Sequence, residues 1–112
     1  MLSAFTLGLL KQRAWMRANF PAARSLLAID ILIHTADNTL RKHPTSMKDL
    51  LGAIPFSEVG IRKQVTRLVK EGWLRIDHSN ADKRIRILVA EEKLLAMLQK
   101  YEVQCALIEA AD

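Results

Sequence analysis

Cysteine, proline and glycine are all scarce in this sequence, and each shortage narrows the kind of protein it can be. The one cysteine among the 112 residues, Cys105, excludes an intrachain disulfide and a cysteine-rich metal site. Three prolines and four glycines, against many Leu, Ile and Ala residues, indicate a mostly helical protein. Half of the residues are hydrophobic, which at this length predicts a single domain, residues 1–112, with one core.

Long uncharged runs and a leader pattern are missing as well. No apolar stretch approaches the ~20 residues that a membrane-spanning helix needs. The first residues, MLSAFTLGLLKQR, place their charges after the apolar run, whereas a signal peptide places them before it. We therefore expect a protein of the reducing cytoplasm that has no membrane partner.

Positive charge is concentrated in the middle of the sequence, although the formal net charge of the whole chain is only +5. Residues 1–40 contribute +2 (four basic, two acidic), residues 41–86 contribute +6 (eleven and five), and residues 87–112 contribute −3 (two and five). A concentrated excess of this kind is typical of a surface that binds a polyanion. A solvated basic face without a partner gives the same pattern and remains open.

The spacing of the apolar residues predicts two long helices at the start of the chain. The first covers about residues 2–18 and ends at NFP, because a residue that precedes proline disfavours helix. The second runs from about Pro21 to Lys42 and includes LLAIDILI, which is apolar on nearly every side. A helix of that kind is expected at the centre of the core.

A short helix and a longer one follow, each with a clear start. Ser46, or Thr45 just before it, is the expected N-cap of MKDLLGAI. Ser57 is the expected N-cap of a helix over about 57–71, and Gly72 is expected to take the left-handed conformation that ends it. The apolar residues of this longer helix share one face: Ile61, Val65, Leu68 and Val69.

After Gly72 the apolar residues alternate, which predicts a β-hairpin over residues 73–89 with HSNADK as its turn. The side chains expected to point inward are Leu74 and Ile76 in the first strand and Ile85, Ile87 and Val89 in the second. Trp73 is expected to pack where the hairpin meets the preceding helix.

The hairpin is crowded with positive charge, and its partner is expected to lie outside the chain. One register that brings the inward residues together pairs Asp77 with Arg84 and Arg75 with Arg86. Like charges directly opposite each other are destabilising. We therefore expect a neighbouring phosphate group, or a DNA minor groove whose negative potential attracts arginine, to relieve the repulsion between Arg75 and Arg86.

The predicted order of elements is a short helix, a turn, a second helix and a β-hairpin. This is the order of a winged helix-turn-helix, a mostly α fold with a β-hairpin wing. Its second helix fits the major groove of double-stranded DNA, where base edges present a readable pattern of donors and acceptors. The residues expected to contact DNA lie on that helix and on the hairpin: Ser57, Glu58, Gly60, Arg62, Lys63, Gln64, Thr66, Arg67, Lys83, Arg84 and Arg86. Gly60 is among them because a residue without a side chain lets the backbone approach DNA closely.

The side chains of the second helix suit different parts of a DNA site. Arg62 and Lys63 are of the type that reaches guanine or a phosphate. Gln64 is of the type that reads adenine, and Thr66 of the type that contacts the methyl group of thymine. Glu58 supports the helix start or accepts a hydrogen bond from cytosine, and both roles remain open.

Over VTRLVKEGWLRIDHSNADKRIRIL the sequence resembles the multiple antibiotic resistance regulator (MarR) family of bacterial transcription factors. The likeness is closest at the end of the recognition helix, at the Gly-Trp junction and at the wing motif Asp-x-Arg, here Asp82-Lys83-Arg84, and it extends more loosely from Leu26 to about Lys100. The resemblance implies that Ser57 to Arg67 lie in the major groove, that Arg84 enters the minor groove and that Asp82 orients it. It also implies a regulator of transcription that forms a homodimer through its terminal helices, and it leaves a small-molecule effector open.

The last predicted helix, about residues 91–111, carries a stripe of mostly apolar residues that are alternately four and three positions apart. Its members are Leu94, Leu98, Tyr101, Cys105 and Ile108. This heptad-like spacing predicts the seam of a homodimer, to which the helix over 2–18 also contributes. Packing of the stripe against the core of its own chain remains the alternative.

Signals of an enzyme are missing. His34, His43 and His78 lie far apart in the sequence and match no spacing of metal ligands. Asp30 and His34, one helical turn apart, are expected to form a buried structural pair, so we expect no catalytic residue, no metal and no cofactor. The alternative to a DNA-binding regulator is a winged helix that contacts another protein within a larger assembly.

Overall fold

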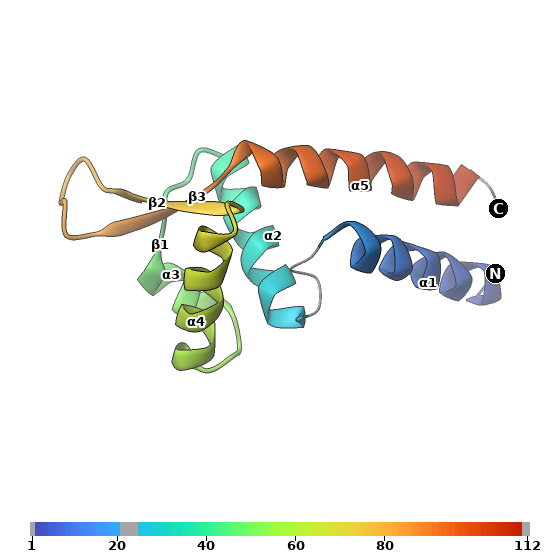
Figure 1. Ribbon diagram of the computed structural model, residues 1–112, viewed down its shortest axis with the longest axis horizontal. Coiled ribbons are helices and arrows are strands. Elements are labelled where there is room, and N and C mark those ends of the chain that lie inside the picture. Colours follow the sequence, from blue (N-terminus) through green and yellow to red (C-terminus); the bar gives the residue numbers. More distant parts are fainter. Residues whose placement is uncertain (1, 21–24, 111–112) are drawn as a thin grey trace.

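Five helices and a three-stranded antiparallel sheet make up the described part of the chain, residues 2–20 and 25–110 of the computed structural model (Figure 1). In chain order the elements are α1 (Leu2–Asn19), α2 (Leu26–Leu40), β1 (Thr45–Ser46), α3 (Met47–Ala53), α4 (Glu58–Lys70), β2 (Leu74–His78), β3 (Arg86–Ala90) and α5 (Glu92–Ala110). The predicted fold class, mostly helical with a β-hairpin wing, is confirmed.

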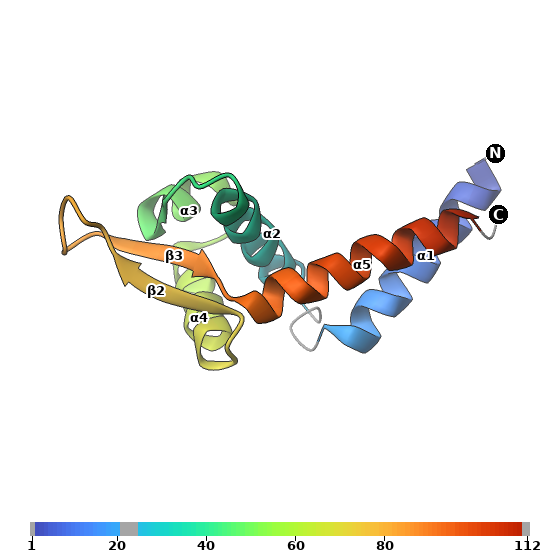
Figure 2. The same cartoon turned by 90° about the horizontal axis from the view of Figure 1, so that it is seen from above.

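The hairpin and the terminal helices lie at opposite ends of an elongated molecule of 50 × 26 × 24 Å (Figures 1 and 2). At one end β2 and β3 extend beyond the helices as a wing. At the other end α1 and α5 contact each other, with the rings of Trp15 and Tyr101 5.5 Å apart. Burial raises the pKa of Tyr101 above its ordinary value of 10.0.

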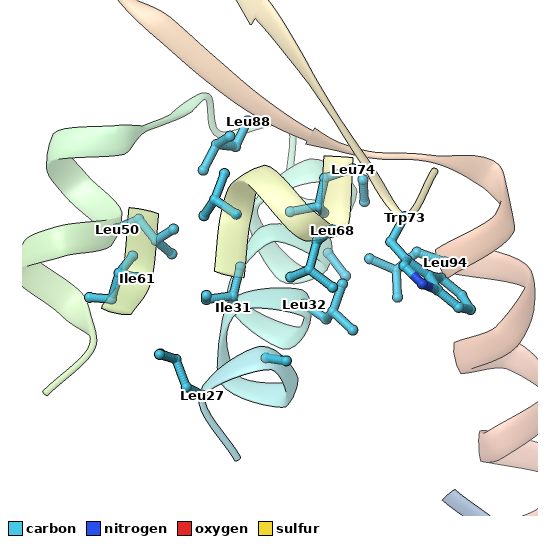
Figure 3. Close-up of a cluster of buried hydrophobic side chains, with 14 of the residues drawn as sticks. Leu27, Ile31, Leu32, Leu50, Ile61, Leu68, Trp73, Leu74, Leu88 and Leu94 are labelled. Atoms are coloured by element: carbon cyan, nitrogen blue, oxygen red, sulfur yellow. The ribbon is translucent and has the colours of Figure 1, made fainter. Parts of the chain in front are cut away.

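Helix α2 is the centre of the core, as its apolar sequence predicts. Ala28, Ile31, Leu32 and Ala36 are buried, and the remaining core side chains reach α2 from α3, α4, the sheet and α5 (Figure 3). The helix begins at Leu26, where the Ser25 hydroxyl accepts a hydrogen bond from the N–H of Ala28. The predicted start at Pro21 lies outside the described residues.

The predicted caps of α3 and α4 are both present, and of the two candidates for α3 it is Ser46 that caps the helix. Ser46 accepts from the N–H of Asp49 at 3.0 Å, while the Asp49 carboxylate accepts from the N–H of Ser46 at 3.2 Å, a reciprocal capping box. Ser57 accepts from the N–H of Gly60 at 3.1 Å. Gly72, with φ +85°, takes the left-handed conformation expected of it after the end of α4.

The predicted strand register is wrong by an odd number of residues, which exchanges the two faces of β3. Arg75 lies opposite Val89, and His78 lies opposite Arg86. The buried side chains of β3 are therefore Leu88 and Ala90, whereas Ile85, Ile87 and Val89, the residues predicted to be inward, are exposed or half-buried.

Two contacts from distant parts of the sequence explain this register. β3 is the central strand, because β1 pairs with its other edge and places Thr45 opposite Leu88. The hydroxyl of Thr39 on α2 also accepts a hydrogen bond from the N–H of Ala90 at 3.0 Å. Ile85 belongs to the hairpin loop, since its N–H donates to Asp82 and its carbonyl accepts from Ser79. The strand therefore starts at Arg86, two residues later than the predicted turn over HSNADK implies.

Trp73 connects the end of α4 to the wing and to α5, in agreement with its predicted position. Its side chain is 2% exposed and stacks on Phe20 with ring centroids 5.8 Å apart. The Nζ of Lys93 on α5 lies 4.2 Å from the ring centroid and donates to the carbonyl of Glu71 at 2.8 Å. These contacts hold the wing in a fixed position relative to α4.

The burial of Leu94 and the exposure of His34 contradict two further predictions. Leu94 is fully buried within its own chain, so it has no surface to offer to a dimer seam, and the alternative of packing on the chain's own core is right at this position. His34 is exposed and Asp30 half-buried, and no hydrogen bond joins their side chains in the part of the chain that the structure describes. The expected buried Asp30–His34 pair is therefore wrong, because this side of α2 is not covered.

Candidate nucleic-acid interface

The start of α3, the start of α4 and the wing converge on a groove of about 670 Å³. We call it the basic groove, because four cationic side chains and one carboxylate line it. Its lining residues are Ser46, Met47, Lys48, Leu51, Glu58, Arg62, Arg84, Ile85 and Arg86. The fold thus brings together Arg62 of α4 with Arg84 and Arg86 of the wing, which are more than 20 positions apart in the sequence.

Helix α4 presents a continuous exposed face beside this groove. The buried stripe of Ile61, Val65 and Leu68 faces the core, because these residues recur at helical spacing. The opposite face is exposed and consists of Val59, Arg62, Lys63, Thr66 and Lys70. Since Trp73 and the capped start at Ser57 fix both ends of α4, these side chains project from a rigid element.

Arg62, one of the residues that line the basic groove, is held by Glu58. The Glu58 Oε1 accepts from Arg62 Nε at 3.1 Å and lies 3.0 Å from its Nη2. Both side chains are at least half exposed, so this ion pair contributes little to stability. Glu58 therefore orients the guanidinium without removing it from solvent, and the remaining N–H groups of Arg62 point to no other side chain of the described residues.

The tip of the wing is ordered by hydrogen bonds to two short side chains. Ser79 accepts from the N–H of Ala81 at 3.2 Å and from the N–H of Asp82 at 3.4 Å. The Asp82 carboxylate in turn accepts from the backbone N–H of Arg84 at 3.0 Å and from its guanidinium at 3.2 Å.

The consequence is an arginine that is exposed and yet oriented. The side chain of Arg84 is 91% exposed, and Asp82 is its one ionic partner among the described residues. The hydrogen bond from Arg84 lowers the pKa of Asp82 below its ordinary value of 3.8, so the carboxylate is ionised near neutral pH.

Three predicted contact residues lie away from this surface. The Cβ that a side chain at Gly60 would add meets the Ser57 Oγ at 2.9 Å and a methyl of Leu27 at 3.6 Å, so the missing side chain serves packing inside the chain. Gln64 is half-buried and its Oε1 has no solvent contact, which contradicts a role in reading adenine in this rotamer. Arg67 is half-buried against Glu71, 3.0 Å away.

The expected repulsion between Arg75 and Arg86 is also wrong. Arg75 donates to Glu91 at 3.1 Å and to Asp77 at 3.3 Å, and the hydrogen bond to Glu91 raises its pKa above its ordinary value. Its charge is therefore compensated within the chain. Other cations have no ionic partner within the described residues: Lys48, Lys63, Lys83 and Arg86.

Sequence reasoning missed two residues of this surface. Lys48 lines the basic groove from the first turn of α3, and its position two residues after the Ser46 cap was the available signal. Val59 is 74% exposed on α4. It precedes Arg62 and Lys63 by three and four residues, which places it on their face of the helix and off the buried stripe.

The opposite end of the molecule is apolar. On α1 the large hydrophobic side chains that are exposed are Leu2, Phe5, Leu7, Leu9 and Leu10, and on α5 they are Val103 and Leu107. Of the predicted seam, Leu98, Tyr101 and Cys105 are half-buried, and the side chain of Ile108 lies outside the described ones. Exposed apolar residues gathered on two adjacent helices are typical of a surface that contacts protein.

Signs of a metal site or of a membrane-spanning helix are missing from the described residues. No three His, Cys, Asp or Glu side chains among them are grouped to hold a metal ion. None of the described helices is both long and apolar enough to cross a membrane. The apolar cavity between α1, α2 and α5 measures about 50 Å³, which is far below the roughly 300–1,000 Å³ of typical small-molecule pockets.

No protein-family model and no curated protein sequence matches the chain. Solved structures do resemble it. The transcriptional regulator Tm0710 from Thermotoga maritima superimposes with a TM-score of 0.76 at 17% identity, over 98% of this chain and 73% of that one. AbsC from Streptomyces coelicolor, a MarR family transcriptional regulator, gives 0.65 at 19% identity, over 96% and 69%. BpsR from Bordetella bronchiseptica, whose DNA binding is regulated by 6-hydroxynicotinic acid, gives 0.59 at 16% identity, over 96% and 74%.

Proposed function

The chain has the winged helix-turn-helix fold of MarR-type transcriptional regulators, and from this premise we propose that it is a transcriptional regulator that binds specific sequences in double-stranded DNA. The observation that carries the proposal is the basic groove. Lys48, Arg62, Arg84 and Arg86 come from three separate elements and line one surface. A concentration of cations on one face is the electrostatic footprint of a nucleic-acid partner.

Helix α4 is the part that enters the major groove. Its exposed face offers Arg62 and Lys63 at the start and Thr66 one turn later, and a helix of this diameter fits the major groove of B-form DNA. Arginine reads guanine through two parallel hydrogen bonds. Arg62 is oriented by Glu58, so it is the residue to which we assign base recognition.

The wing reaches the adjacent minor groove. Arg84 is exposed at the tip, and its guanidinium is held by Asp82 before DNA arrives. A narrow minor groove has an enhanced negative potential that attracts inserted arginine. Lys83 and Arg86, which have no ionic partner among the described residues, then lie close to phosphates on either side.

The protein acts as a homodimer whose interface is formed by α1 and α5. The exposed apolar side chains of α1, with Phe5 and Leu10 above 60% exposure, require cover, and a second copy provides it at the end of the molecule remote from the wing. On α5, Leu94 leaves the proposed seam because it belongs to the core, and the remaining members are Leu98, Tyr101, Cys105 and Ile108. A twofold dimer binds a pseudo-palindromic site. It acts in the cytoplasm and has no catalytic step.

A titration with genomic DNA fragments tests the proposal. Fluorescence anisotropy of labelled fragments, with unlabelled unrelated DNA as competitor, separates specific from general binding. Full affinity of both Arg62→Ala and Arg84→Ala at physiological salt would reject DNA recognition by this surface. A winged helix used for protein contact would show no salt-dependent DNA binding at all.

A further inference from the structure

One large apolar side chain on α4 has no role in the fold. Val59 is 74% exposed, more than any other large hydrophobic residue of this helix, and it contributes nothing to the buried cluster. The start of the helix does not need it, because Ser57 supplies the cap and Glu58 the negative charge of the first turn. A β-branched residue also has a lower helix propensity than most exposed alternatives.

The position of Val59 on the helix is that of a contact residue. At 3.6 residues per turn, Val59, Arg62, Lys63 and Thr66 lie within about a third of the helix circumference, opposite the stripe of buried residues. Arg62 and Lys63 flank Val59 one turn later along the helix. Any partner that these two cations draw to α4 therefore removes water from Val59.

We propose that Val59 contacts the C5-methyl group of a thymine in the major groove and so selects that base. This inference rests on the proposed DNA binding and adds to it the identity of one nucleobase that the protein recognises. The thymine methyl is the one apolar group that unmodified base pairs present in the major groove, so it is the group that an exposed valine among cations recognises.

Thr66 is the other methyl-bearing residue on this face and reads a different position. It lies seven residues after Val59, which is about 10 Å along the helix axis, or roughly three base pairs. Its hydroxyl donates to the carbonyl of Arg62 at 3.0 Å, which leaves its methyl group for a separate contact. Variants of the two residues should therefore affect different thymines.

Replacement of thymine by deoxyuridine, which lacks only the methyl group, tests the contact. On a DNA site selected by the wild-type protein, each thymine is replaced in turn and the affinity is measured by fluorescence anisotropy. The wild-type protein is expected to lose about fourfold in affinity at one thymine of each half-site, the effect of burying one methyl group. Val59→Ala is expected to bind thymine and uracil equally at that position and to retain every other preference.

Matched variants separate a base contact from a general loss. Val59→Ile keeps an apolar side chain and should keep the preference, whereas Thr66→Ser should change it only at another position. Unchanged thermal unfolding of Val59→Ala confirms that the exposed side chain is not needed for folding. A thymine preference of Val59→Ala that equals that of the wild type at every position would overturn the inference and leave DNA binding intact. Absence of salt-dependent DNA binding by the wild type would instead reject the proposed function itself.

Discussion

Removal of Arg62 should weaken DNA binding far more than it weakens the fold. On the protein side, Arg62→Ala removes an exposed ion pair with Glu58, which is worth about 0.3–0.5 kcal/mol for residues four apart on a helix. On the DNA side it removes a guanine contact worth about 1–3 kcal/mol, or roughly 5- to 150-fold in affinity. The two losses differ enough to be measured separately.

Arg41 offers a matched control for this variant. It makes the same kind of exposed pair, four residues from Asp37, and it does not line the basic groove. Anisotropy titrations at one salt concentration, paired with urea unfolding followed by circular dichroism, should show that Arg62→Ala and Arg41→Ala are equally stable. Only Arg62→Ala should lose affinity and relax the preference for one base. Equal affinities of the two variants would refute the assignment of Arg62 to base recognition.

Further predictions concern the core, the wing and the dimer. Trp73→Ala should lower the free energy of unfolding by about 3–5 kcal/mol, since the ring is fully packed between Phe20 and Lys93; a urea midpoint close to that of the wild type would contradict the packing argument. Asp82→Asn should reduce DNA affinity by about two- to tenfold, because the guanidinium of Arg84 loses its orientation although it keeps its positive charge. Affinity equal to that of the wild type would show that the orientation is irrelevant. Because the pKa of Asp82 is lowered below 3.8, its contact with Arg84 is complete above that pH and is lost only as the pH falls through the lowered value, which the pH dependence of the Arg84 Nε–H resonance checks. Phe5→Glu should convert the dimer to a monomer in sedimentation, and a dimer of unchanged strength would place the interface elsewhere.

Local signals in the sequence were enough to predict most helices and their caps. The cap at Ser46, the cap at Ser57 and the left-handed Gly72 each depend on residues within four positions, and all three are present. The same holds for the wing motif, in which Asp82 contacts Arg84 two residues later. Interactions of this range are visible in a short window of sequence.

The strand register was not predictable in this way, because it depends on contacts that join distant segments. The hydrogen bond from Ala90 to Thr39 spans 51 residues, and the two-residue strand β1 carries too little sequence to be recognised. The ion pair of Arg75 with Glu91 spans 16 residues and removed the charge conflict that the sequence suggested. Leu94 fits a heptad seam by its spacing, and only the tertiary structure shows that its own core covers it.

The slope of log affinity against log salt concentration is the most direct test of a single DNA-binding surface on α3, α4 and the wing. Each neutralised phosphate contributes about −0.9 to the slope. With four to six cations engaged per chain, the expected slope is about −4 to −5 per protomer, or roughly −7 to −11 for a dimer. Joint replacement of Lys48, Arg62, Arg84 and Arg86 by alanine should make it shallower by about 3–4 per protomer. A wild-type slope near zero, or a slope that the fourfold variant leaves unchanged, would contradict the assignment of this surface to DNA.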